Sequence, residues 1–79
     1  MTKAPAEAEL AERIANYLKV EMKRHKVTYD EMAQRLRDQG LNETRDSVAA
    51  KLKRGTFAAT FMLACFAALK LERINLEDI

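Results

Sequence analysis

The chain has very few of the residues that interrupt helices, form cross-links or build metal sites. Its 79 residues include two glycines, one proline, one cysteine, one histidine and no tryptophan. One cysteine cannot form an intramolecular disulfide, and His25 has no second histidine and no nearby cysteine with which to hold a metal. The shortage of glycine, proline and β-branched residues favours helices over strands. We therefore expect an all-α fold with no bound metal.

The chain also lacks a hydrophobic stretch long enough to span a membrane. The longest run without a charged residue, from Gly55 to Leu69, is too short for a transmembrane helix. Residues 1–20 carry Glu7, Glu9 and Glu12 and no continuous apolar segment, so they do not resemble a secretory leader. We expect a cytoplasmic protein without a membrane partner.

No group of residues has the arrangement that catalysis requires. Cys65 lies in an apolar segment, where a cysteine behaves as a small hydrophobic side chain. The only histidine lies in a charged segment, away from this cysteine, so it supplies no nearby base. Gly40 and Gly55 are isolated and form no glycine-rich phosphate loop. We expect neither enzymatic activity nor a cofactor.

Apolar residues recur at helical spacing along four segments. In the first segment, Leu10, Ile14, Leu18 and Met22 follow one another every four residues. A chain of this length forms one domain. We therefore predict that residues 1–79 form a single bundle of four to five helices. The expected helices span residues 6–26, 28–39, 44–54 and 58–70.

The two ends of the chain show no clear periodicity. We expect residues 1–5 to be loose, and residues 71–79 to form a short C-terminal arm. Leu71, Ile74 and Leu76 neither alternate strictly nor share a helical face. The arm is therefore an extended segment, a strand that pairs with a symmetry mate, or a final turn folded on the core, and the sequence does not choose among the three.

Residues 28–55 have the features of two short helices joined by a turn. Thr28 and Glu31 are spaced as a capping box, which starts the first helix. Gly40 is suited to the positive φ angle that ends it. Asn42 or Thr44 can cap the second helix, which stops at Gly55. Two short helices around a glycine turn predict a helix-turn-helix.

Residues 27–71 contain the stretches V-T-Y-D-E-M-A-Q-R-L, G-L and V-A-A-K-L-K-R-G, followed by an apolar segment that ends A-A-L-K-L. They resemble the helix-turn-helix of the phage-repressor family, the Cro and λ-repressor type often called XRE-like. More narrowly, nearly the whole chain is similar to a group of small uncharacterised bacterial proteins of about this length. In that group the patterns V-T-Y-x-E-x-A-x-x-L, L-N-E-T, K-L-x-R-G-x-F and R-I-x-L-E-D-I recur. The narrower resemblance implies no activity, whereas the broader one implies a λ-repressor-like fold that binds DNA.

The broader resemblance also implies a set of DNA contacts. The phosphate-binding helix start corresponds to Thr28 and Tyr29, the base-facing positions to Thr44, Arg45 and Ser47, and the trailing contact loop to Arg54 and Thr56. The chain departs from the family at the turn, because Arg37, Asp38 and Gln39 come between the last apolar residue of the first helix and the turn glycine. The connection is longer than the family's, which puts the position of the second helix on DNA in doubt.

Charge and helical spacing indicate the same surface. The net charge is only +2, but the segment from Lys19 to Arg54 contains ten lysines and arginines and only six aspartates and glutamates. A local excess of cations suits a polyanion. If Val48 and Leu52 face the core, the second helix turns its polar residues outward, where Arg45 can read guanine. The cations suited to phosphates are Lys51, Lys53 and Arg54.

The segment 58–69 is apolar on all sides. It is either a central core helix wrapped by the rest of the chain, or a helix that the other three helices are too few to cover. We expect its exposed part to contact another chain, through Phe61, Met62 and Phe66. Two functions follow. The first is a bacterial transcriptional regulator that binds duplex DNA sequence-specifically as a homodimer. The second is a protein-interaction module, antitoxin-like or an adaptor, that uses the apolar helix to bind a protein partner.

Overall fold

Every regular element in the described part of the chain, residues 4–79 of a computed structural model, is helical. This confirms the all-α prediction. The elements are α1 (Ala4–Arg24), α2 (Tyr29–Asp38), α3 (Arg45–Arg54), α4 (Ala59–Ala68) and a short 3-10 turn, η1 (Leu76–Asp78). None of the described helices is both long and apolar enough to cross a lipid bilayer.

The N-terminal end differs from what the sequence suggested. Of the five residues expected to be loose, residues 1–3 lie outside the described part of the chain, but Ala4 and Pro5 belong to the first turn of α1. Proline is well suited to this place, because its fixed φ angle is helical and a first-turn N–H has no intrahelical partner to lose. The expectation of a loose start was therefore wrong for these two residues.

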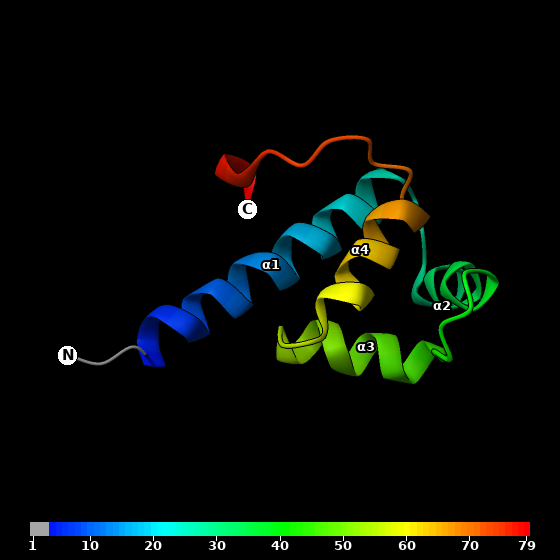
Figure 1. Cartoon of the computed structure of the whole chain (residues 1–79), viewed down its shortest axis with the longest axis horizontal. Coiled ribbons are helices and arrows are strands. Elements are labelled where there is room, and N and C mark those ends of the chain that lie inside the picture. Colours follow the sequence, from blue (N-terminus) through cyan, green and yellow to red (C-terminus); the bar gives the residue numbers. More distant parts are fainter. Residues whose placement is uncertain (1–3) are drawn as a thin grey trace.

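One hydrophobic core joins the four helices. Its fully buried side chains come from every helix: Leu18, Met32, Leu36, Val48, Leu52, Cys65 and Leu69. In Figure 1, α1 runs along one side of the molecule, α2 is seen nearly end-on, and α3 lies across the bottom. The helices α2 and α3 therefore cross at a steep angle, and α3 forms one outer edge of the protein.

The start and the end of α2 follow the predicted local chemistry. The backbone N–H of Thr28 donates to the Glu31 carboxylate at 3.0 Å, and the backbone N–H of Glu31 donates to the Thr28 hydroxyl at 3.1 Å. This is the predicted capping box. Beyond the helix, Gly40 has a φ of 95°, so glycine avoids the cost that a side chain would incur there. The chain then runs through residues 39–44 before α3 begins.

The end of α3 is packed tightly against α1. Gly55 caps α3 in the left-handed conformation, with a φ of 74°. A Cβ atom at this position would overlap the backbone carbonyl of Ala11 in α1. Only glycine therefore permits both the turn and this close approach of the two helices. The contact fixes the C-terminal end of α3 relative to α1.

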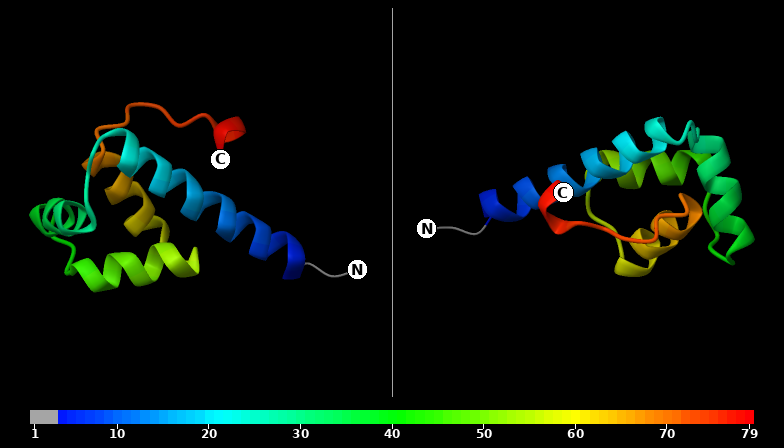
Figure 2. Two further views of the ribbon diagram at one scale, coloured as in Figure 1. Left: turned by 180° about the vertical axis from the view of Figure 1, so that it is seen from behind. Right: turned by 90° about the horizontal axis from the view of Figure 1, so that it is seen from above.

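The C-terminal arm takes the last of the three conformations that the sequence left open. It returns along α1 on the side of the molecule opposite α3, as Figure 1 and the two views of Figure 2 show. Leu71 and Ile74 pack against the core. The Arg13 guanidinium donates to the carbonyl oxygen of Ile79, from Nε at 3.0 Å and from Nη2 at 2.6 Å. The arm is thus a final turn folded onto α1.

Candidate nucleic-acid interface

The helix α3 has one buried face and one exposed face. Val48 and Leu52 are completely buried, whereas Arg45, Ala50 and Lys53 are exposed. The outward-facing positions predicted from the sequence are therefore mostly correct. The full set of exposed residues on this helix is Arg45, Asp46, Ala50, Lys53 and Arg54.

The first turn of α3 uses two of the predicted base-reading side chains for its own cap. The Thr44 hydroxyl accepts the backbone N–H of Ser47 at 3.1 Å, and the Ser47 hydroxyl accepts the backbone N–H of Thr44 at 2.8 Å. The Ser47 hydroxyl also donates to the Glu43 carboxylate at 2.6 Å. Ser47 is half-buried. The Ser47 hydroxyl, predicted to contact a base, is therefore already engaged within the chain by the Glu43 carboxylate and the backbone of Thr44.

Glu43 is the residue on which this arrangement depends. Its side chain is only 8% exposed, and the Lys51 ammonium and the Ser47 hydroxyl both bind its carboxylate. The backbone carbonyl of Glu43 accepts a hydrogen bond from Arg37 at 2.9 Å. A buried carboxylate needs such partners, because desolvation of a lone charge is costly. Glu43 thus ties the α2–α3 connection to the inner side of α3.

Lys51 is consequently occupied inside the protein. Besides its ion pair with Glu43, its ammonium lies 4.9 Å from the centre of the Phe61 ring. A cation over an aromatic face is attracted by the negative face of the ring. Lys51, which the sequence predicted to contact DNA phosphates, is therefore engaged by two partners within the chain, which hold it against α4 and the α2–α3 connection.

The pKa of Glu43 reflects these opposing effects. Burial raises it, but the hydrogen bonds from Lys51 and Ser47 and the Lys51 charge outweigh burial, so the pKa lies below its ordinary value. Reasoning from the sequence overlooked Glu43. The signal that could have revealed it is the spacing of Glu43, Ser47 and Lys51, each four residues from the next, which places all three on one helical side.

Arg45 is exposed at the start of α3 between two carboxylates. Its Nε lies 3.8 Å from Asp30 and its Nη1 lies 3.7 Å from Asp46. All three side chains are more than half exposed, Arg45 itself by 61%. Exposed ion pairs of this kind contribute at most about 1 kcal/mol. Arg45 can therefore exchange these partners for an external one.

At the other end of α3 the predicted cations are free on the surface. Lys53 and Arg54 are exposed. The Arg54 guanidinium reaches the backbone carbonyl of Thr56 at 3.2 Å and its hydroxyl at 3.3 Å. These contacts keep Arg54 beside the α3–α4 corner without neutralising its charge. Lys53, Arg54 and Thr56 thus lie together at an exposed, positively charged corner.

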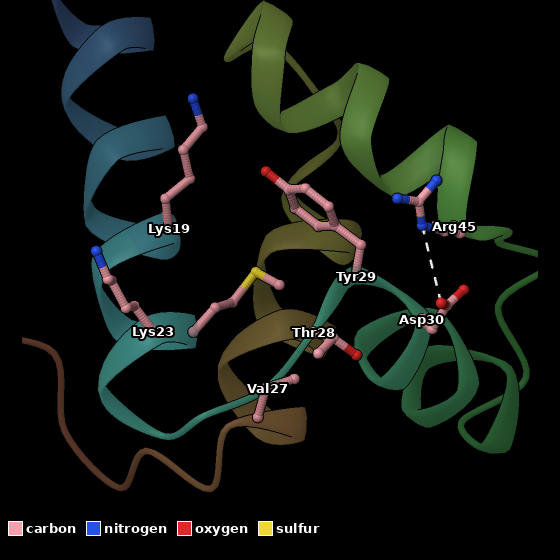
Figure 3. Close-up of a pocket in the computed structure, with 8 residues that line it drawn as sticks. Lys19, Lys23, Val27, Thr28, Tyr29, Asp30 and Arg45 are labelled. Atoms are coloured by element: carbon pink, nitrogen blue, oxygen red, sulfur yellow. Dashed lines mark ion pairs between the residues drawn. The ribbon is translucent and has the colours of Figure 1, made fainter.

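The helix α1 adds cations that the sequence did not assign to this surface. A groove of about 490 Å³ separates the second half of α1 from the starts of α2 and α3, and Figure 3 shows it in close-up. Its lining residues are Lys19, Met22, Lys23, Val27, Thr28, Tyr29, Asp30 and Arg45. Thr28 and Tyr29, which the resemblance assigns to phosphate binding, are both among the residues that line this groove. Lys19 and Lys23 were not among the DNA contacts predicted from the sequence, because their distance from α3 depends on the fold.

The apolar residues proposed as a contact with another chain are mostly in the core. Phe61 is 3% exposed and Phe66 is 8% exposed, so both predictions were wrong. Phe66 packs edge-on against the Tyr17 ring of α1, with 6.2 Å between the ring centres. Only Met62 is half-buried, beside Leu63, which is 61% exposed.

The cysteine is buried, and the histidine is at the end of α1. Burial raises the pKa of the Cys65 thiol to about 12, so the thiolate nucleophile is scarce at neutral pH. His25 is exposed at the end of α1, with Nε2 3.5 Å from the Glu21 carboxylate. Within residues 4–79, no three side chains of the types that bind metals lie together.

Residues 10–74 match the family described as Domain of unknown function (DUF6471). The match covers most of the chain, so the protein belongs to this family. No curated protein and no solved structure matches it.

Proposed function

We propose that this member of the DUF6471 family binds duplex DNA through the exposed side of α3, and that it acts as a transcriptional regulator of the phage-repressor type. The observation that carries the proposal is the division of α3 into two sides. The apolar side is fully buried, and the opposite side, from Arg45 to Arg54, is open to solvent at an edge of the molecule. A helix exposed in this way can enter a major groove.

The steep crossing of α2 and α3 supports this proposal (Figure 1). In a helix-turn-helix, the second helix lies in the groove while the first crosses the DNA backbone. Here the longer connection leaves α3 exposed and does not turn it inward. Arg45 is at the N-terminal end of α3, where recognition helices contact base edges.

The exposed cations have different roles in this proposal. Arg45 reads a guanine through two hydrogen bonds, and Ala50 contacts a thymine methyl group. Lys53 and Arg54 bind phosphates, which position the protein without reading sequence. Asp46 opposes binding except beside a cytosine amino group, because a carboxylate can only accept hydrogen bonds there. Removing Arg45 should therefore reduce the affinity for a preferred sequence, whereas removing Lys53 should reduce the affinity for all sequences alike.

A single domain of this kind buries roughly 600–1,000 Å² of its surface on DNA. We infer that two copies bind together, with their α3 helices about 34 Å apart on successive major grooves. Sedimentation equilibrium at tens of micromolar tests this inference. A dimer mass is expected, and a monomer mass both free and in the presence of a duplex would exclude it.

The direct test of DNA binding is the affinity for a random-sequence duplex at two salt concentrations. For each phosphate neutralised, log K should fall by about 0.9 per unit of log salt. The double variant Lys53→Ala/Arg54→Ala should lower that slope by about two. Arg73→Ala is the matched control, because Arg73 is an exposed cation in the arm on the opposite side of the molecule from α3. Equal losses in both variants would mean that the attraction is not localised on α3, and the proposal would be wrong.

A protein-interaction module remains the second candidate, because Leu63 is an exposed large apolar residue on α4 and its neighbour Met62 is only half-buried. This candidate predicts no binding of duplex DNA at physiological salt. It also predicts that Leu63→Ser abolishes capture of the protein partner and leaves the free energy of unfolding nearly unchanged. DNA binding that Leu63→Ser leaves intact favours the first function.

A further inference from the structure

The groove between α1 and the start of α2 combines cations with a hydroxyl donor. Tyr29 is half-buried, and in Figure 3 its ring lies across the groove with the hydroxyl directed toward the opening between α1 and α3. Lys19 extends its ammonium into the same opening from α1. Lys23, one turn further along α1, lines the groove but directs its ammonium away from Tyr29.

The chemistry of the opening suits a phosphate group. An ammonium and a phenol hydroxyl both donate hydrogen bonds, and a phosphate oxygen only accepts them. Arg45 closes the other side of the opening, where its guanidinium is shared with Asp30. Asp30 is the only carboxylate among the lining residues, and it lies on the Arg45 side, away from Lys19. Met22 and Val27, which are both buried, supply apolar atoms to the lining.

We propose that this groove binds one backbone phosphate of the duplex, and that Lys19 and Tyr29 are the residues that hold it. The inference rests on the proposed function and extends it, because it brings α1 into the interface. The phosphate lies beside the start of α3, where Arg45 contacts the bases. The groove thereby sets the register of α3 along the DNA, as phosphate contacts do in other complexes.

Three single variants distinguish a phosphate site in the groove from a general attraction of DNA to the positive charge of the surface. Lys19→Ala should reduce the slope of log K against log salt by about 0.9, the value for one phosphate contact, and should weaken binding about tenfold. Tyr29→Phe keeps the ring but removes the hydroxyl. It should weaken binding about tenfold through loss of one hydrogen bond to a charged group, and should leave the slope unchanged. Lys23→Ala, which removes the same charge from the same helix, should change the affinity by about twofold or less.

The outcomes separate the groove from the proposed function. If the wild-type protein binds duplex DNA but Lys19→Ala and Lys23→Ala weaken binding equally, or Tyr29→Phe has no effect, the groove holds no phosphate and the proposed function stands. If the wild-type protein shows no salt-dependent binding of duplex DNA, the proposed function and the groove site both fail. Thermal unfolding of each variant, expected to match the wild type within about 0.5 kcal/mol for exposed Lys19 and Lys23, shows that losses of affinity are not losses of fold.

Discussion

Lys51 and Lys53 are two residues apart on the same helix, yet they have different surroundings. Lys51 lies inward, with its ammonium on the buried Glu43 carboxylate and over the Phe61 ring. Lys53 lies outward and is exposed. At about 100° per residue, a spacing of two residues along a helix turns their directions roughly 200° apart. The pair shows that α3 carries two kinds of cation. One kind stabilises the fold through contacts inside the protein, and the other is available to an external anion.

The largest expected effect is on stability, at the inner pair. Glu43→Ala should lower the free energy of unfolding by about 2–3 kcal/mol, because it leaves the Lys51 ammonium half-buried without its partner and frees the Ser47 hydroxyl. Lys53→Ala is the matched control and should change the free energy by no more than about 0.5 kcal/mol. Urea unfolding followed by circular dichroism measures both. Equal effects would show that the buried Glu43 carboxylate contributes no more to stability than the exposed Lys53.

The second expected effect is on DNA binding. Here the exposed Lys53 should matter more than the inward-facing Lys51. Lys53→Ala should weaken duplex binding about tenfold, as the loss of one phosphate contact at moderate salt. Lys51→Met keeps the length of the side chain and should leave the affinity of the folded fraction within about twofold. Fluorescence anisotropy with a labelled duplex, at a temperature where both variants are folded, gives the two affinities. A larger loss for Lys51→Met would contradict the division of α3 into two sides.

The third prediction concerns pH. The pKa of Glu43 is lower in the folded protein than its ordinary value of 4.5. The ionised carboxylate therefore contributes stability that is fully present above the unfolded-state pKa and is lost as pH falls through the lower, folded-state pKa. Glu43→Gln removes this contribution, so its stability should depend less steeply on pH than that of the wild type below about pH 4.5. Parallel curves of unfolding free energy against pH would show that Glu43 has no favourable partner.

These differences show which parts of the molecule the sequence can predict. The helix bounds came within about two residues of those observed, because capping residues and apolar spacing act within a few residues of each other. Gly40 and Gly55 have the positive φ angles expected for helix ends. Both capping residues, Thr28 and Thr44, also make the hydrogen bonds proposed for them.

The predictions that failed depend on contacts between distant segments. The spacing of Glu43, Ser47 and Lys51 places them on one helical side, but the ion pair that distinguishes Lys51 from Lys53 forms only because the α2–α3 connection brings the Glu43 carboxylate to the inner side of α3. The burial of Phe61 and Phe66 has a similar origin. The sequence suggested that three helices could not cover α4, but α1 packs Tyr17 against Phe66 and the C-terminal arm adds Leu71 and Ile74 to the core.

The smallest expected effect is at Arg45. Asp30→Asn removes one of the two carboxylates beside the guanidinium and should raise the affinity for duplex DNA about twofold, with little change in stability, because exposed ion pairs are weak. Measuring the affinity of Asp30→Asn for a preferred duplex and for a random-sequence duplex shows whether the gain in affinity is the same for both. A loss of affinity in Asp30→Asn would mean instead that the carboxylate positions Arg45 for binding.

The central claim is that the exposed side of α3 is the surface that meets duplex DNA. The most direct test is to titrate isotope-labelled protein with a duplex and to map the amide shifts along the chain. Shifts should cluster at residues 19, 28–30, 45–46, 50 and 53–54. Shifts confined to residues 57–69, or none up to millimolar duplex at low salt, would contradict it.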